Sequence, residues 1–194
     1  LYAISLQMNG NKEAAINELQ KCIESARKTD LMYLTRLQTG INYAHILSAD
    51  FIEAKKWSTP MIRIMEQSKS GYALSWGHFL NGYIEYNLMS LEMAVEHFEA
   101  ALEYRFISEM GISVNAFIGC SLSYQMLGNQ EKAHHVFDEM IDFAGDINNP
   151  EFLEIIPSYK ARFDLINGDL NTALEWARTF PSLNIDIMSI FLWI

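Results

Sequence analysis

Five alanines recur along the sequence at nearly constant spacing, and this spacing restricts the fold more than any other feature. They are Ala15, Ala54, Ala94, Ala133 and Ala173, separated by 39, 40, 39 and 40 residues. A period between about 20 and 50 residues is typical of solenoids, in which each unit packs only on its neighbours. A small residue inside a helix also lets a second helix approach closely. The chain is therefore predicted to be a helical repeat protein.

A residue that favours the start of a helix lies four positions before each alanine. Asn, Asp and Ser side chains accept hydrogen bonds from the free amides of the first helical turn. Each repeat is therefore predicted to contain a short turn that leads into a capped helix. The turn residues and caps are Gly10 and Asn11, Ala49 and Asp50, Met89 and Ser90, Gly128 and Asn129, and Gly168 and Asp169.

A second helical pattern precedes each capped helix. Apolar residues recur three or four positions apart, as in Phe117, Cys120 and Tyr124, and no strand pattern competes with them. The two helices of a repeat are expected to form an antiparallel pair. We expect helices near 1–8, 11–28, 31–48, 50–67, 71–88, 90–105, 108–127, 129–144, 150–167 and 169–180, and the start of another from about 184.

The predicted fold is all-α, a right-handed superhelical solenoid of about five antiparallel helix pairs in one domain. Three prolines modify it: Pro150 suits a first helical position, whereas Pro60 should kink its helix and Pro157 should bend or restart its own. The expected repeats are 1–30, 31–69, 70–107, 108–148 and 149–181, with the start of a further helix at 184–194.

Charge and composition restrict the partners. The formal net charge is -10, so this segment is expected to repel nucleic acid and to make no direct contact with it. No apolar run approaches the roughly 18 to 20 residues of a membrane span. We expect a cytoplasmic chain with no membrane partner. Cys22 and Cys120 fall in distant repeats and are expected to be free and buried. The start at Leu1 and the apolar end predict an excerpt of a longer chain.

The repeats resemble the tetratricopeptide repeat, whose small-small-aromatic-small signature would be occupied by Gly82, Ala94, Phe98 and Ala101. The period of 39 or 40 residues exceeds the 34 of that family. The longer period, with segments such as GCSLSYQMLGNQEKA, looks like the superhelical repeat region of the MalT-like regulators of the LuxR class. That resemblance implies a sensing segment, with a nucleotide-binding module ahead of it and a helix-turn-helix domain after it.

Motifs of catalysis and cofactor binding are missing. Neither GxxxxGK[ST] nor GxGxxG occurs, so no cofactor is expected in this segment and no enzymatic activity is predicted. His134 and His135 are adjacent but lack the companions of a metal motif, and His45, His78 and His97 look isolated. No metal site is predicted.

In tetratricopeptide-like stacks the first helix of each pair lines the concave surface, and its inner positions can be counted back from the repeated alanines. Aromatic side chains beside amide and guanidinium groups suit a sugar, a small metabolite or a peptide. The alternative is that this aromatic stripe only packs in the core. The predicted groove residues are Arg36, Thr39, Tyr43, Trp76, Phe79, Tyr83, Tyr86, Asn87, Asn115, Ile118, Leu122, Gln125, Ser158 and Arg162.

The predicted function is sensing of an effector or partner within a multidomain bacterial transcriptional regulator, through binding and conformational coupling. The alternative is a stand-alone tetratricopeptide-like scaffold for protein partners. The expected partner is a protein or a small-molecule effector. Self-association through the apolar ends of the segment is a further expectation.

Overall fold

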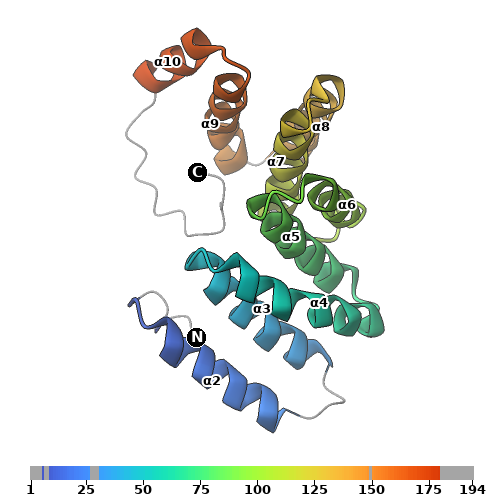
Figure 1. The fold of residues 1–194 in the computed structure, drawn as a ribbon. Coiled ribbons are helices and arrows are strands. Elements are labelled where there is room, and N and C mark those ends of the chain that lie inside the picture. The colour runs from blue at the N-terminus through green and yellow to red at the C-terminus, as the bar shows by residue number, and fades with distance from the viewer. Residues whose placement is uncertain (1–5, 7–8, 27–30, 149, 180–194) are drawn as a thin grey trace.

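A computed structural model describes residues 6, 9–26, 31–148 and 150–179, and within them the only regular elements are helices (Figure 1). The helices predicted at 1–8 and from 184 lie, apart from residue 6, outside these residues. The helices are α2 (Lys12–Ser25), α3 (Leu31–Leu47), α4 (Phe51–Ser68), α5 (Gly71–Asn87), α6 (Leu91–Leu102), α7 (Met110–Met126), α8 (Gln130–Ile147), α9 (Pro150–Ile166) and α10 (Leu170–Thr179).

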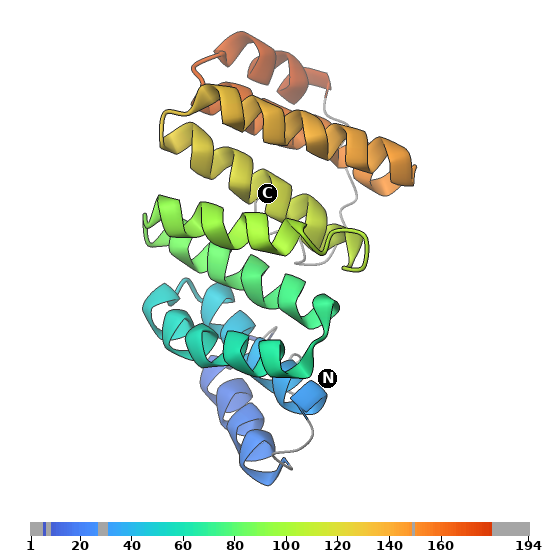
Figure 2. The same cartoon turned by 90° about the vertical axis from the view of Figure 1, so that its right-hand side faces the viewer.

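The helices form a solenoid of antiparallel pairs, as predicted (Figures 1 and 2). The pairs are α3 with α4, α5 with α6, α7 with α8 and α9 with α10, and α2 packs on α3 as the second helix of the first repeat. Among first helices, α3 contacts α5 and α5 contacts α7, whereas the described second helices make no comparable contacts with one another. The stack is therefore tighter on the side of the first helices, and that side is concave.

The same turn joins the two helices of each repeat. Its central residue is left-handed at all five positions, with φ of 76° at Gly10, 55° at Ala49, 62° at Met89, 79° at Gly128 and 85° at Gly168. The next amide donates a 2.9 Å hydrogen bond to the carbonyl five residues earlier in every case. This bond closes a Schellman motif, which ends a helix and reverses the chain.

Three of the five predicted capping side chains are confirmed. The side-chain oxygens of Asn11, Asn129 and Asp169 each accept a hydrogen bond from the amide three residues further on, at 3.1–3.2 Å. Each bond satisfies one amide that has no partner within the helix.

Asp50 and Ser90 occupy the same position but make no such bond, so this prediction was wrong there. The Asp50 carboxylate instead accepts a 2.9 Å hydrogen bond from Lys12 of the preceding repeat and lies 3.3 Å from Nδ1 of His45. The Lys12 hydrogen bond lowers the pKa of Asp50. At this turn the acidic side chain links two repeats instead of capping a helix.

Four of the five repeated alanines are buried in the stack. Ala15, Ala54, Ala94 and Ala133 are at most 1% exposed, whereas Ala173 of the last described pair is half-buried. The Ala133 carbonyl also accepts a 2.7 Å hydrogen bond from Ser121 of α7, the first helix of its own pair. The predicted register is therefore confirmed in the first four repeats.

Phe98 of α6 fills the space between its own first helix and the next one. A Cβ atom on Gly82 of α5 would lie 2.7 Å from Cδ1 of Phe98, and one on Gly119 of α7 would also collide with the ring. One period earlier, Ser58 and Asn42 replace Phe98 and Gly82, and both are fully buried. A small residue on one helix is thus matched by a larger one on its neighbour.

Several local predictions need correction. Helix α9 continues through Pro157, so the restart predicted there does not occur. Pro60 lies within α4, and the kink expected at that position stays a prediction. The amide that proline lacks costs one hydrogen bond, which packing of the remaining turns offsets. Helix α6 ends at Leu102, earlier than expected, and α8 continues to Ile147. Pro150 begins α9 as predicted.

Both cysteines are free, as predicted, but only Cys120 is buried, while Cys22 is partly exposed. The described helices include none whose length and hydropathy would suit it to cross a membrane.

The left-handed conformation of the turn predicts that glycine at position 89 gives a more stable protein than methionine. A non-glycine residue in this conformation costs about 1–2 kcal/mol, and glycine gives back part of that through the entropy of the unfolded chain. Because the Met89 side chain is 63% exposed, little packing is lost. Urea unfolding of Met89→Gly should show a gain of roughly 0.5–1 kcal/mol. Gly128→Ala should lose stability, and equal midpoints for both variants would contradict this account of the turn.

The close packing around Phe98 predicts that one methyl group added beside the ring destabilises the stack. Gly119→Ala should cost about 1–3 kcal/mol, because the ring and both helices must shift. Gly145→Ala in α8 is the matched control, since no atom lies within 4 Å of its added carbon. It should be neutral or gain up to about 1 kcal/mol from helix propensity. Thermal unfolding that ranks the two variants in the opposite order would refute close packing at Phe98.

Candidate functional site

A pocket of about 200 Å³ lies between α3 and α5 on the concave side. We call it the α3–α5 pocket. Three predicted groove residues, Arg36, Thr39 and Trp76, line it together. Arg36 is exposed, whereas Thr39 and Trp76 are partly buried. The complete lining is Met32, Thr35, Arg36, Thr39, Met65, Tyr72, Ala73 and Trp76.

Tyr72 ties this pocket to the next repeat, and sequence reasoning missed it. Its hydroxyl donates a hydrogen bond to the carboxylate of Glu109, which stands directly before α7. Burial, and then the Glu109 carboxylate, raise the pKa of Tyr72, while a hydrogen bond from Trp76 and the charge of Arg36 act in the opposite direction. The pocket wall is therefore held by residues from three repeats.

The buried side of the pocket carries a polar group with no partner. Thr35 is only 5% exposed, and its hydroxyl makes no hydrogen bond to any described residue. A buried hydroxyl without a partner costs about 1–3 kcal/mol, so it is an unusual choice for a residue that only packs. Gln38 and Asn42 on the same helix also have unpartnered buried atoms. The sequence signal that could have found them is a polar residue in an otherwise apolar helix face.

A second group of predicted residues meets where α5 faces α9. Burial raises the pKa values of Tyr83 and Tyr86, and the positive charge of Arg162 opposes the shift in both. Tyr43 of α3 raises the pKa of Tyr83 further. The Nδ2 atom of Asn87 donates a 2.8 Å hydrogen bond to the Tyr83 carbonyl. The structure thus brings together residues of the second, third and fifth repeats, as the counted register predicts.

Other predicted groove residues are buried. Phe79 is 1% exposed and packs against Phe98 and Tyr83. On α7, Asn115 is fully buried and donates to the Gly111 carbonyl, and Gln125 is 5% exposed and donates to the Phe163 carbonyl on α9. Ile118 and Leu122 are each 2% exposed. These five residues belong to the packing between helices and offer almost no surface. The four on α7 are covered because α5, α6 and α8 all pack against that helix, and Phe79 of α5 is covered by Phe98 of α6.

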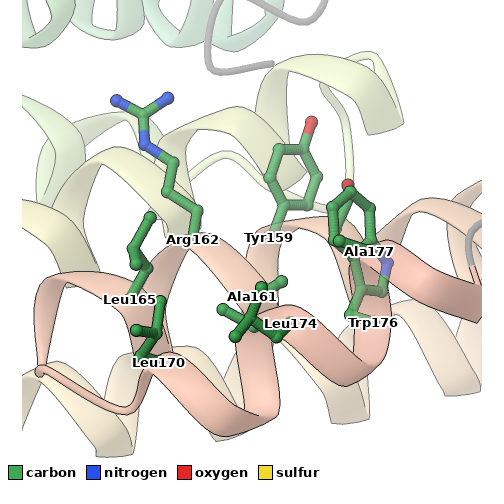
Figure 3. A pocket seen from close by; sticks show the side chains of 10 residues that line it. Tyr159, Ala161, Arg162, Leu165, Leu170, Leu174, Trp176 and Ala177 are labelled. Atoms are coloured by element: carbon green, nitrogen blue, oxygen red, sulfur yellow. The ribbon is translucent and has the colours of Figure 1, made fainter.

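A larger, apolar pocket of about 420 Å³ lies between α9 and α10 (Figure 3). Its lining includes the predicted residues Ser158 and Arg162, with Tyr159, Ala173 and Trp176. The hydroxyl of Tyr159 is buried without a described hydrogen-bond partner, and burial raises its pKa. Because Ala173 occupies the position that is buried in the preceding repeats, we assign this pocket to repeat packing.

Metal ligation finds no support in the geometry of the described residues, which contain no group of three His, Cys, Asp or Glu side chains placed to hold an ion.

Comparison with known proteins identifies the fold. No protein-family model matches the chain, and no curated protein sequence matches it. Two crystal structures of the nearly identical TPR-like repeats of a protein described as a kinesin light chain, from Podosopora anserina, are similar to it. One has a TM-score of 0.71 at 15% identity and the other 0.69 at 16%, and each match covers 91% of this chain. The matches cover 88% and 89% of those chains. The chain therefore has a TPR-like repeat fold.

The unpartnered hydroxyl of Thr35 predicts a stabilising substitution. Thr35→Val keeps the shape of the side chain and removes the buried hydroxyl, so the free energy of unfolding should rise by about 1 kcal/mol. Ser75→Ala is the control, because the Ser75 hydroxyl is buried and bonded to Ser108 at 2.7 Å, and its loss should destabilise. Chemical denaturation measures both. A destabilised Thr35→Val would mean that its hydroxyl has a structural role.

Proposed function

We propose that this chain binds a protein partner on its concave surface, and that the α3–α5 pocket receives one side chain of that partner. The observation that carries the proposal is the pocket itself, which combines an exposed guanidinium, an indole wall and a buried unpartnered hydroxyl. Arg36, Thr39 and Trp76 of its lining were predicted by counting positions in a tetratricopeptide-like stack. The TPR-like fold supports the proposal because a solenoid presents an extended concave surface.

The size of the pocket favours a protein partner over a small-molecule effector. Sites for small molecules usually enclose about 300–1,000 Å³. The α3–α5 pocket measures about 200 Å³. An engineered cavity of about 150 Å³ holds a benzene molecule, so the observed volume suits a single side chain. A partner peptide would place one residue here and extend along the groove toward α9.

The lining explains how such a residue would be held. Met32 and Met65 have flexible, polarisable thioethers that adapt to apolar groups, and Trp76 offers a flat apolar face. Thr35 can give or accept one hydrogen bond on the buried side, and Arg36 offers several fixed donors. Apolar contact would supply most of the affinity, and these polar groups would set the orientation.

We place this binding segment within a MalT-like transcriptional regulator. The support for this context is the sequence resemblance and the 39- or 40-residue period. Binding across several repeats would change the small rotation between neighbours and so transmit a signal along the stack. A stand-alone scaffold is the alternative. A P-loop encoded ahead of residue 1 and a basic helix-turn-helix encoded after residue 194 of the reading frame would favour the regulator over the scaffold.

The test is selection of peptides from a random displayed library against the whole chain, followed by titration of the enriched peptides. Trp76→Ala and Arg36→Ala should each weaken binding about five- to a hundred-fold, the range expected for an anchor contact worth about 1–3 kcal/mol. Arg36 is exposed, so its variant should fold normally.

Glu131→Ala is the control, since this residue is exposed in the first turn of α8 on the outer helix layer. Its affinity should remain within about twofold of wild type. Peptides that bind Trp76→Ala and Arg36→Ala as tightly as wild type would show that the α3–α5 pocket is not the binding site.

A further inference from the structure

Two histidines that look isolated in the sequence face each other inside the third repeat. His78 of α5 and His97 of α6 are 19 residues apart, and their Nδ1 atoms lie 3.1 Å from each other. The prediction that they are isolated was wrong, because the antiparallel pairing of α5 with α6 brings them together. Both rings are partly buried.

The rings meet end to end. Their centroids are 5.4 Å apart and their planes differ by 40°. This separation is close to the largest that a 3.1 Å distance between the two nitrogens allows, so each Nδ1 points at the other ring. Ligands of one metal ion would instead converge on a point beside the line between them. The geometry is that of an N–H···N hydrogen bond, with one imidazole as donor and the other as acceptor.

This hydrogen bond holds one proton between two nitrogens. A second proton removes the acceptor and leaves two imidazolium cations in contact. Burial lowers the pKa of both His78 and His97, and their mutual repulsion lowers that of His78 further. The neutral pair is therefore the favoured form in the folded chain.

Charged groups from α4, α5 and the end of α6 act on the pair. Glu66 of α4 and Glu103, directly after α6, raise the pKa of His78, and Glu85 of α5 raises that of His97. Lys55 of α4 opposes Glu85, with which it forms a 2.8 Å ion pair. Helix α7 carries no acidic, basic or histidine side chain. The carboxylates only partly offset burial, so the net direction for both histidines is downward.

We infer that the His78–His97 pair is a pH-sensitive latch between α5 and α6, which a second proton opens. Opening would tilt α5 away from α6, against the packing of Phe98 on Gly82, and turn α5 relative to α3. Helix α5 also carries Trp76, one wall of the α3–α5 pocket, two residues before His78. The latch therefore links the shape of the groove to pH, a property that the proposed partner binding does not require.

The direction of the pH effect follows from the lowered pKa values. Above the usual histidine pKa of about 6.5, both the folded and the unfolded chain carry neutral imidazoles, and the stabilisation is fully present. As the pH falls below this value, the unfolded chain binds protons more readily than the folded chain. The folding equilibrium then shifts toward the unfolded state until the folded pair is protonated as well.

The first test is urea unfolding between pH 8 and pH 5.5, above the range in which most carboxylates titrate. The folding equilibrium of the wild type should fall by about tenfold or more across this range, and that of His97→Gln should fall clearly less. His135→Gln is the matched control, because the His135 side chain is 73% exposed. The folding equilibrium of His135→Gln should change with pH as much as that of the wild type. The same change in His97→Gln would contradict the inference of a latch.

A second measurement uses only the wild-type chain, so it does not require any variant to fold. Imidazole nitrogen shifts in the wild-type chain, followed by NMR, should give two coupled titrations below pH 6.5 for His78 and His97. Independent titrations of the two histidines at or above pH 6.5 would show that they do not form a hydrogen-bonded pair.

The third measurement separates a latch from a purely structural hydrogen bond. Small-angle scattering of the wild type should show a larger radius of gyration at pH 5.5 than at pH 7.5, and His97→Gln should not show this change. An unchanged wild-type radius would reduce the pair to a local contact and contradict the inference. None of these experiments uses a partner, so their failure would leave the proposed groove binding unaffected.

Discussion

The close approach of helices around one large side chain is the contact on which the stack depends. Phe98 is fully buried between Gly82 of its own repeat and Gly119 of the next, where even a methyl group would collide with the ring. Such packing fixes both the distance and the angle between neighbouring pairs, because interiors at this density cannot yield without strain. The repeated alanines impose the same condition elsewhere, and the left-handed turns set the direction in which each second helix returns.

These contacts also create the groove. Since the first helices contact one another directly, residues spaced three or four apart on α3 and α5 face a common concave surface. Arg36, Thr39 and Trp76 lie at such positions, and their helices leave a space the size of one side chain between them. Tyr72 closes this space through its hydrogen bond to Glu109. The candidate site is thus a consequence of repeat geometry, with polar groups added to an apolar wall.

The repeat period, the capping residues and the apolar spacing together predicted the helix pairs, the turns and most of the register, because each depends on local signals that recur along the chain. The register counted on a tetratricopeptide-like stack also predicted that Arg36 and Trp76 share a surface. It failed for Phe79, Asn115 and Gln125, whose burial depends on neighbouring helices that no local pattern describes. It missed Tyr72 and Thr35 for the same reason, and it missed the contact of His78 with His97, which are 19 residues apart. The restart predicted at Pro157 did not occur, because α9 continues through that residue.

The central claim is that partners are bound at the α3–α5 pocket. The most direct measurement is the position of the Trp76 indole N–H signal in a nitrogen–proton NMR spectrum while a selected peptide is added. The account predicts that this signal, assigned by its loss in Trp76→Phe, moves in proportion to occupancy while that of Trp57 on α4 stays in place. A shift of the Trp57 or Trp176 signal with Trp76 unchanged would contradict it and place binding on the outer layer or between α9 and α10.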